Sequence, residues 1–284
     1  MADFAYRGSQ LIDLSSEKTK DLPNDFQSKN WKFFAWVPND SPSLLVSDQE
    51  FPREDIQKFD PDLSKIEPTL FFSDEKATLR AIAYSHEGTS VASAFVYPAI
   101  TGVRKNELAE VRLIASERHI IAEIDGGVSF VDYSLKWSPD GSKLIWIVNN
   151  AKQGFSSYEL WIADQKTGTA KKLIVIAQSI QYNHPPAWSP DGARIAVIKV
   201  QEDNDKYSSH ISLLDPLTGI EKQVAYFDNK ISNLQWFSNE WLVFTLSKGD
   251  YGEIWMTSLD GSQQFPIAGP TLPDAPIILF SGGE

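Results

Sequence analysis

The feature that most constrains this sequence is a repeated unit built on an aromatic anchor and a tight turn. An aromatic residue followed by Ser-Pro-Asp-Gly occurs at 137–141 and again at 188–192, and weaker copies surround Trp36, Tyr84 and Trp236. Successive anchors are 48, 53, 51 and 48 residues apart. A period of this length is typical of four-stranded β-propeller blades. The sequence therefore predicts an all-β fold made of radial sheets.

Each copy also contains the turns that such a blade needs. In Ser-Pro-Asp-Gly, proline presets φ, aspartate bonds the backbone ahead and glycine accepts φ > 0, so this motif predicts a hairpin between the first and second strands. An alternating segment with an Asp-containing turn follows at 159–168, 211–219 and 253–261, and more loosely at 56–62. It predicts the third and fourth strands. The anchor aromatic is expected to lie between neighbouring sheets, where it buries a large area.

These patterns predict a single propeller domain over residues 1–284. Five blades are expected, at about 31–71, 78–124, 131–176, 183–227 and 231–268. The ends predict a sixth, composite blade built from 8–24 together with 275–281, because closing a propeller from both termini removes exposed sheet edges. A five-bladed ring with a closing extension and a part of a longer propeller are the alternatives.

The Trp-Ser-Pro-Asp-Gly turns and the Leu-Trp-Ile-x-Asp strand at 160–164 resemble the PD40 repeats of TolB-like, WD40-like propellers. The resemblance covers roughly 30 to 268, and related repeats occur in the propellers that cap prolyl-oligopeptidase-type peptidases and in cell-envelope proteins. It implies an extracytoplasmic location, in the periplasm or at the cell surface. TolB proteins carry an α/β domain before the propeller, whereas only about 30 residues precede the first complete blade here.

Composition excludes several kinds of function. Acidic residues outnumber basic ones by 38 to 26, which disfavours nucleic acid because its affinity comes from neutralised phosphates. Without cysteine there can be no disulfide or thiolate metal site. The four histidines lack ligand spacing, so no metal site and no cofactor are expected. No apolar stretch is long enough to insert into a membrane, and the first residues do not resemble a signal peptide.

The candidate binding residues lie on one face of the predicted propeller. The first-to-second and third-to-fourth turns share one end of each blade, the turn face, and are short and repetitive. The second-to-third loops and the links between blades share the other end, the looped face, and differ from blade to blade. Variable loops on a rigid scaffold are the usual place for binding residues. Aromatic residues on this face are the expected contacts for a protein or peptide partner, although blade-edge packing is the simpler interpretation of any one of them: Phe51, Tyr97, Phe155, Tyr158, Tyr207 and Tyr251.

A second group of polar residues is expected to surround the mouth of the central channel. It consists of Arg80, Asp132, Asn183, His184 and Asn233. Convergent polar groups in a concavity predict a small-ligand site. The simpler alternative is that they hold water.

No catalytic residue is predicted. The chain has no Gly-x-Ser-x-Gly and no phosphate-binding glycine motif after a strand. The preferred hypothesis is thus a non-catalytic module that recruits a protein or peptide through the looped face. The alternatives are a propeller-type glycosidase or lyase at the channel mouth, and the accessory propeller of a larger peptidase.

Overall fold

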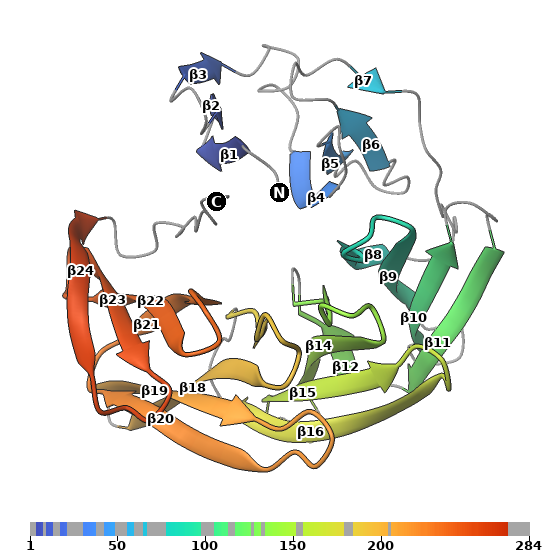
Figure 1. Ribbon diagram of the computed structural model, residues 1–284. Helices are drawn as coiled ribbons and strands as arrows, with labels where there is room; N and C mark the ends of the chain where they lie inside the picture. The colour runs from blue at the N-terminus through green and yellow to red at the C-terminus, as the bar shows by residue number, and fades with distance from the viewer. Residues whose placement is uncertain are drawn as a thin grey trace.

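The computed structural model describes residues 4–7, 10–13, 18–21, 31–37, 43–48, 56–59, 65–66, 78–97, 105–112, 117–125, 128–131, 134–151, 156–178, 184–203 and 206–271. Throughout this part of the chain the regular elements are β-strands, and every pair is antiparallel. Figure 1 shows the sheets following one another around a common centre, with β16, β20 and β24 at the periphery. This is the arrangement of a β-propeller.

Six sheets are formed in chain order. The N-terminal sheet consists of β1 (Phe4–Arg7), β2 (Gln10–Asp13) and β3 (Lys18–Asp21). Blade 1 consists of β4 (Trp31–Val37), β5 (Ser43–Asp48), β6 (Ile56–Phe59) and β7 (Lys65–Ile66). Blade 2 consists of β8 (Thr78–Tyr84), β9 (Ser90–Tyr97), β10 (Lys105–Arg112) and β11 (Glu117–Asp125).

The remaining three sheets complete the described chain. Blade 3 consists of β12 (Val128–Phe130), β13 (Lys136–Trp137), β14 (Lys143–Asn150), β15 (Ser157–Asp164) and β16 (Thr169–Gln178). Blade 4 consists of β17 (Ala187–Trp188), β18 (Ile195–Asp203), β19 (Lys206–Leu214) and β20 (Glu221–Phe227). Blade 5 consists of β21 (Ile231–Trp236), β22 (Trp241–Ser247), β23 (Gly252–Ser258) and β24 (Gln264–Thr271).

Two differences from the sequence prediction stand out. A strand, β1, precedes the predicted segment 8–24 and pairs with β2 inside it, so β2 is the middle strand of its sheet. The first strand of blade 3 is divided into β12 and β13, both paired with β14. The predicted closing strand at 275–281 lies outside the described residues.

The Ser-Pro-Asp-Gly motifs form the same hydrogen-bonded turn in blades 3 and 4. In blade 3, Ser138 Oγ donates to Asp140 Oδ1 at 2.6 Å, and the Ser142 amide donates to the same oxygen at 3.0 Å. These bonds hold the pKa of Asp140 down, to about 2, because they favour the charged carboxylate. Ser258, Asp260 and Ser262 form the same arrangement at the third-to-fourth turn of blade 5. The same Ser-x-Asp-Gly pattern therefore forms both the first-to-second turn and the third-to-fourth turn.

Anchor tryptophans join neighbouring blades, as expected. Trp137 Nε1 donates to the Ala83 carbonyl of blade 2, and Trp236 Nε1 donates to the Ala187 carbonyl of blade 4, both at 3.0 Å. Trp188 Nε1 is buried and has no hydrogen-bond partner in the described structure. The anchors thus fix blade against blade by packing, and in two cases by a hydrogen bond as well.

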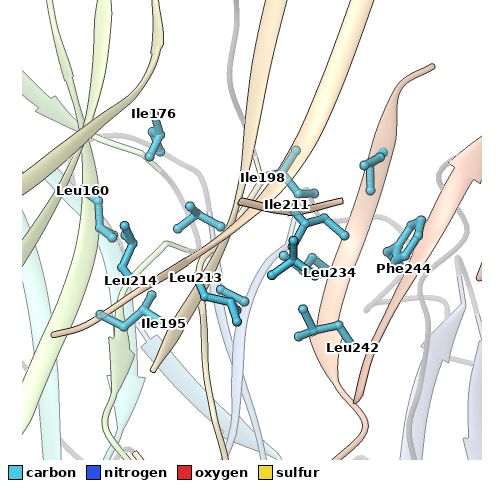
Figure 2. Packing of buried hydrophobic residues seen from close by; sticks show 14 of the residues in the cluster. Leu160, Ile176, Ile195, Ile198, Ile211, Leu213, Leu214, Leu234, Leu242 and Phe244 are labelled. Carbon is cyan, nitrogen blue, oxygen red and sulfur yellow. The ribbon is translucent and has the colours of Figure 1, made fainter. Parts of the chain in front are cut away.

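The core consists of apolar layers between the blades. One cluster joins blades 3, 4 and 5, and a second joins blades 2 and 3 around the fully buried Trp146. Figure 2 shows side chains of the first cluster, from Leu160 of blade 3 through Ile195 of blade 4 to Phe244 of blade 5. Such layers leave the loops and turns at the two ends of the propeller as the accessible surfaces.

The fourth strands of blades 2 to 5 each contain a bulge. At this bulge an apolar residue is left out of the pairing register, namely Ile121, Leu173, Val224 or Ile267. We call it the seat residue. A turn glycine of the following blade lies against the seat carbonyl: Gly168 against Ile121, Gly219 against Leu173 and Gly261 against Val224. These glycines all have positive φ. This backbone conformation favours glycine at all three positions, and at Gly261 an added Cβ would also overlap the Val224 carbonyl oxygen.

Candidate functional site

Three of the predicted looped-face aromatics have described side chains. They are Tyr97, Tyr158 and Tyr251. Of Tyr207 only the backbone is described, in β19 opposite Glu202. Phe51 and Phe155 lie outside the described residues. The structure therefore shows the surroundings of three of the predicted aromatic side chains, and these three differ in how far they are buried.

Tyr158 is a packing residue, which corrects the expectation that it is exposed. Its side chain is 7% exposed and belongs to the cluster between blades 3, 4 and 5. Asn149 Nδ2 donates to its hydroxyl at 3.4 Å. The physical reason is that β15 begins at Ser157, so Tyr158 lies inside a strand that packs on both faces.

Tyr97 is half-buried at the end of β9. Its hydroxyl donates to Glu107 Oε1 on the neighbouring strand at 3.4 Å, and Glu107 is itself buried. Tyr97 therefore supplies a hydrogen-bond donor to the buried carboxylate of Glu107 in blade 2. Its binding role stays a prediction.

Tyr251 is the exposed aromatic of the set, with 44% of its surface accessible. It lies in the loop between β22 and β23, where the Lys248 amide donates to its carbonyl at 2.8 Å. Together with the end of β24 it borders an open groove of about 590 Å³. The other residues along the groove are Glu253, Pro266, Ile267, Ala268, Gly269 and Pro270.

Two contacts within blade 5 hold the side chain of Trp255 in place. Trp255 Nε1 donates to Glu253 Oε2 at 2.9 Å, and Lys248 Nζ lies 5.5 Å from the centre of the Trp255 ring. The Trp255 ring also meets Phe227 of blade 4 edge-on, at 6.2 Å between centroids. Glu253, which lines the groove, is thus held by a tryptophan that itself packs against blade 4.

Of the predicted channel residues, Arg80, His184 and Asn233 are described, whereas Asp132 and Asn183 are not. Arg80 and His184 each precede their anchor aromatic by the same number of residues, so they occupy equivalent positions in blades 2 and 4. His184 is buried. Buried Arg80 Nε has no hydrogen-bond partner in the described part of the chain. Asn233, at a positive φ of 54°, donates to Ser232 Oγ at 3.3 Å and Thr245 Oγ1 at 3.4 Å.

Lys136 is an inner-strand residue that sequence reasoning did not single out. It lies on the inner strand β13, at the position before the anchor, where blades 2 and 4 have Ala83 and Ala187. Desolvation by the surrounding strands lowers the pKa of its ammonium group, although the side chain keeps an exposed surface and solvent still reaches it. The signal was present in the sequence, because Lys136 is the one charged residue among the positions before the five anchors.

Glu110 is a second residue that the sequence did not single out. It is 1% exposed, and Gln165 Nε2 of blade 3 donates to both of its carboxylate oxygens, at 3.0 and 2.9 Å. The pairing registers place it where blades 3 and 4 have the apolar Ile162 and Leu213. It borders a cleft between blades 2 and 3 on the turn face. Only the alignment of repeats reveals this exchange of an apolar residue for a carboxylate.

Two general features concern the whole described region. No group of three or more acidic or histidine side chains in it is arranged to hold a metal ion. Its secondary structure also contains no long apolar helix of the kind that crosses a membrane.

The sequence matches no protein-family model, and no curated protein is significantly similar to it. Solved structures are similar in fold. TolB from Acinetobacter baumannii is 19% identical with a TM-score of 0.54, over 93% of this chain and 61% of that one. An oligogalacturonate lyase in complex with manganese is 13% identical with a TM-score of 0.63, over 91% and 70%.

A third similar structure is the propeller domain of the Trilobed protease from Pyrococcus furiosus, which has an open velcro topology. It is 14% identical with a TM-score of 0.53, over 92% of this chain and 74% of that one. At these identities the likeness concerns the fold alone, and the fold hosts both binding proteins and enzymes. The chain therefore has a β-propeller fold similar to those of TolB and the other two proteins, as its repeats predicted.

Proposed function

We propose that this chain is a non-catalytic binding propeller that recruits a protein or peptide partner through its looped face, outside the cytoplasm. Exposed Tyr251 beside a groove supports this proposal most directly. Tyrosine supplies a large amphipathic contact area at little entropic cost and is enriched at binding hot spots. The rigid blade beneath it reduces the cost of association further.

The test uses two exposed aromatics on opposite ends of one blade. Tyr251 lies on the looped face, and Phe237, 56% exposed, lies at the first-to-second turn on the turn face. Immobilised wild-type protein, Tyr251→Ala and Phe237→Ala are each incubated with cell-envelope extract, and captured proteins are quantified by mass spectrometry. We expect one partner to be lost with Tyr251→Ala and retained with Phe237→Ala. Equal capture by all three folded proteins would rule out this face as the binding surface.

A second candidate is an enzyme working in the central channel, and Lys136 is the observation that favours it. A lysine whose pKa is lowered is suited to removing a proton from a substrate, and Lys136 lies on the inner strand β13. The similarity to an oligogalacturonate lyase suggests the first substrate to try. Turnover followed by ultraviolet absorbance of the unsaturated product should be present in wild type and lost in Lys136→Met. Absence of turnover by the wild type would end the case for this substrate.

A further inference from the structure

The contact between blades 2 and 3 contains a polar pair where the contact between blades 4 and 5 is apolar. Leu213 of β19 and Leu259, the residue after β23, pack in one apolar cluster and line a cleft between blades 4 and 5. Glu110 of β10 and Gln165, the residue after β15, occupy the equivalent positions between blades 2 and 3. The repeated fold therefore does not require a carboxylate here, because two leucines serve in its place.

Glu110 is almost completely buried, and its hydrogen-bond partner is a neutral group. Its side chain belongs to a residue only 1% exposed, and Gln165 Nε2 donates to both of its oxygens, at 3.0 and 2.9 Å. The ion pairs between described residues involve Glu159 and Glu221, not Glu110. A carboxylate that is removed from water and given one neutral donor retains much of its desolvation cost, which a cation beside it would offset.

The space next to this carboxylate is a cleft of about 190 Å³ on the turn face, all of whose lining residues are described. At about 30 Å³ per water molecule, it has room for roughly six waters, or for the end of one long side chain. The first-to-second turns of blades 2 and 3 form its walls. Lysine and arginine are absent from the lining residues, and the titratable groups among them are His86, Glu87, Glu110 and Asp140.

The groups along the cleft favour a positively charged ligand with an apolar stem. Gln165 directs its amide nitrogen at Glu110, so its carbonyl oxygen is left without a donor from any described residue. The Asp140 carboxylate is held in its charged form by the turn, which lowers its pKa to about 2. Trp137 and Pro139 supply apolar surface, against which an alkyl stem or a flat guanidinium group can pack. The formal charge of −12 on the whole chain attracts a basic partner at longer range.

We propose that this cleft binds one basic side chain of a partner protein, whose guanidinium or ammonium group pairs with Glu110. The cation supplies the charge that the buried carboxylate lacks, and the Gln165 carbonyl is available as a second acceptor. The inference is independent of the looped face, because the cleft lies at the other end of the blades.

The experiment follows the side-chain amide of Gln165, which donates directly to Glu110, by nitrogen-15 NMR. The amide signal is assigned by its loss in Gln165→Leu. The probes are N-acetyl-arginine amide and N-acetyl-lysine amide, each titrated into the folded protein. N-acetyl-citrulline amide is the matched control, since it has the shape of the arginine probe without its charge.

Three variants accompany the titrations. Glu110→Gln removes the charge and keeps the size of the side chain. Glu240→Gln is its control, because Glu240 is an exposed carboxylate on the equivalent turn of blade 5. The double variant Glu110→Leu with Gln165→Leu introduces the leucine pair that blades 4 and 5 have, and its stability is compared with wild type by urea unfolding.

We expect the arginine or the lysine probe to shift the amide signal saturably in wild type and in Glu240→Gln. The citrulline probe, or Glu110→Gln, should weaken binding about tenfold or more, the loss expected for one charge-assisted hydrogen bond. The leucine pair should unfold at no lower urea concentration than wild type, because no buried carboxylate remains to be compensated.

Four results would overturn the proposal: equal binding of the citrulline probe, unchanged binding by Glu110→Gln, no shift with either basic probe, or a leucine pair that is less stable than wild type. The last result would show that the carboxylate serves the fold instead of a ligand. If Glu110→Gln does not fold, the comparison of the arginine and citrulline probes on wild type decides alone.

Discussion

Among the described turn glycines, Gly261 lies closest to the neighbouring blade. It has a φ of +73°, and a methyl group there would overlap the Val224 carbonyl oxygen of blade 4. Gly249 has a φ of +82° with open space around it. Gly249→Ala should therefore cost only the backbone penalty, about 1–2 kcal/mol. Gly261→Ala should cost about 1–3 kcal/mol more, because the blades must also separate. Urea unfolding followed by circular dichroism compares the two, and equal losses would contradict the close packing.

His210 is expected to make stability depend on pH. Burial lowers its pKa below the ordinary value of 6.5, and the positive charge of nearby Lys199 adds to this, whereas Glu221 acts in the opposite direction. The unfolded chain therefore takes up a proton first as the pH falls. Stability should decrease on acidification below about 6.5, by at most about 1.4 kcal/mol per pH unit for one group.

The measurement for His210 is the free energy of unfolding of wild type and His210→Gln between neutral and mildly acidic pH. The variant should lose part of the slope. His86 is exposed, so His86→Gln serves as the control. A slope that His210→Gln leaves unchanged would show that the proton is taken up elsewhere.

At the scale of the element, the inner strands are held together by their anchor tryptophans. Trp137→Phe removes the hydrogen bond to the Ala83 carbonyl and leaves that buried acceptor with one donor fewer. We expect this to lower the free energy of unfolding by about 1–3 kcal/mol, in addition to the packing lost with the smaller ring. Trp188 makes no such bond to any described residue, so Trp188→Phe should lose the packing contribution alone. Thermal and urea unfolding of both variants checks the difference, and a larger loss for Trp188→Phe would contradict it.

Elements differed in how far the sequence could predict them. The blade hairpins were predictable because an anchor and an Asp-Gly turn are local signals. Strand β1 has neither, and only the Gly8-Ser9 pair before β2 hinted at a hairpin. Tyr158 was misjudged because the border between a loop and β15 cannot be located to one residue. The groove beside Tyr251 could not be predicted, since it arises where β24 returns to the loop before β23.

At the scale of the whole molecule, the composite closing blade remains a prediction. Because the chain has no cysteine, two introduced cysteines can form a disulfide only with each other or with those of another chain. We expect Ala5→Cys, in β1, to form an intramolecular disulfide with a cysteine introduced at Ile277, Ile278 or Leu279. Closing so long a loop should stabilise the fold by about 4 kcal/mol or more if the geometry is unstrained. Non-reducing gels and urea unfolding report it. Disulfides formed only between two chains, or by none of the three pairs, would contradict this closure.

The two prolines of β24 limit how its uncharged edge can be used. Pro266 and Pro270 carry no amide hydrogen, so a foreign strand laid along this edge finds gaps in the row of donors that a continuous ladder requires. The edge thus resists the strand-by-strand stacking through which exposed apolar edges grow into fibrils.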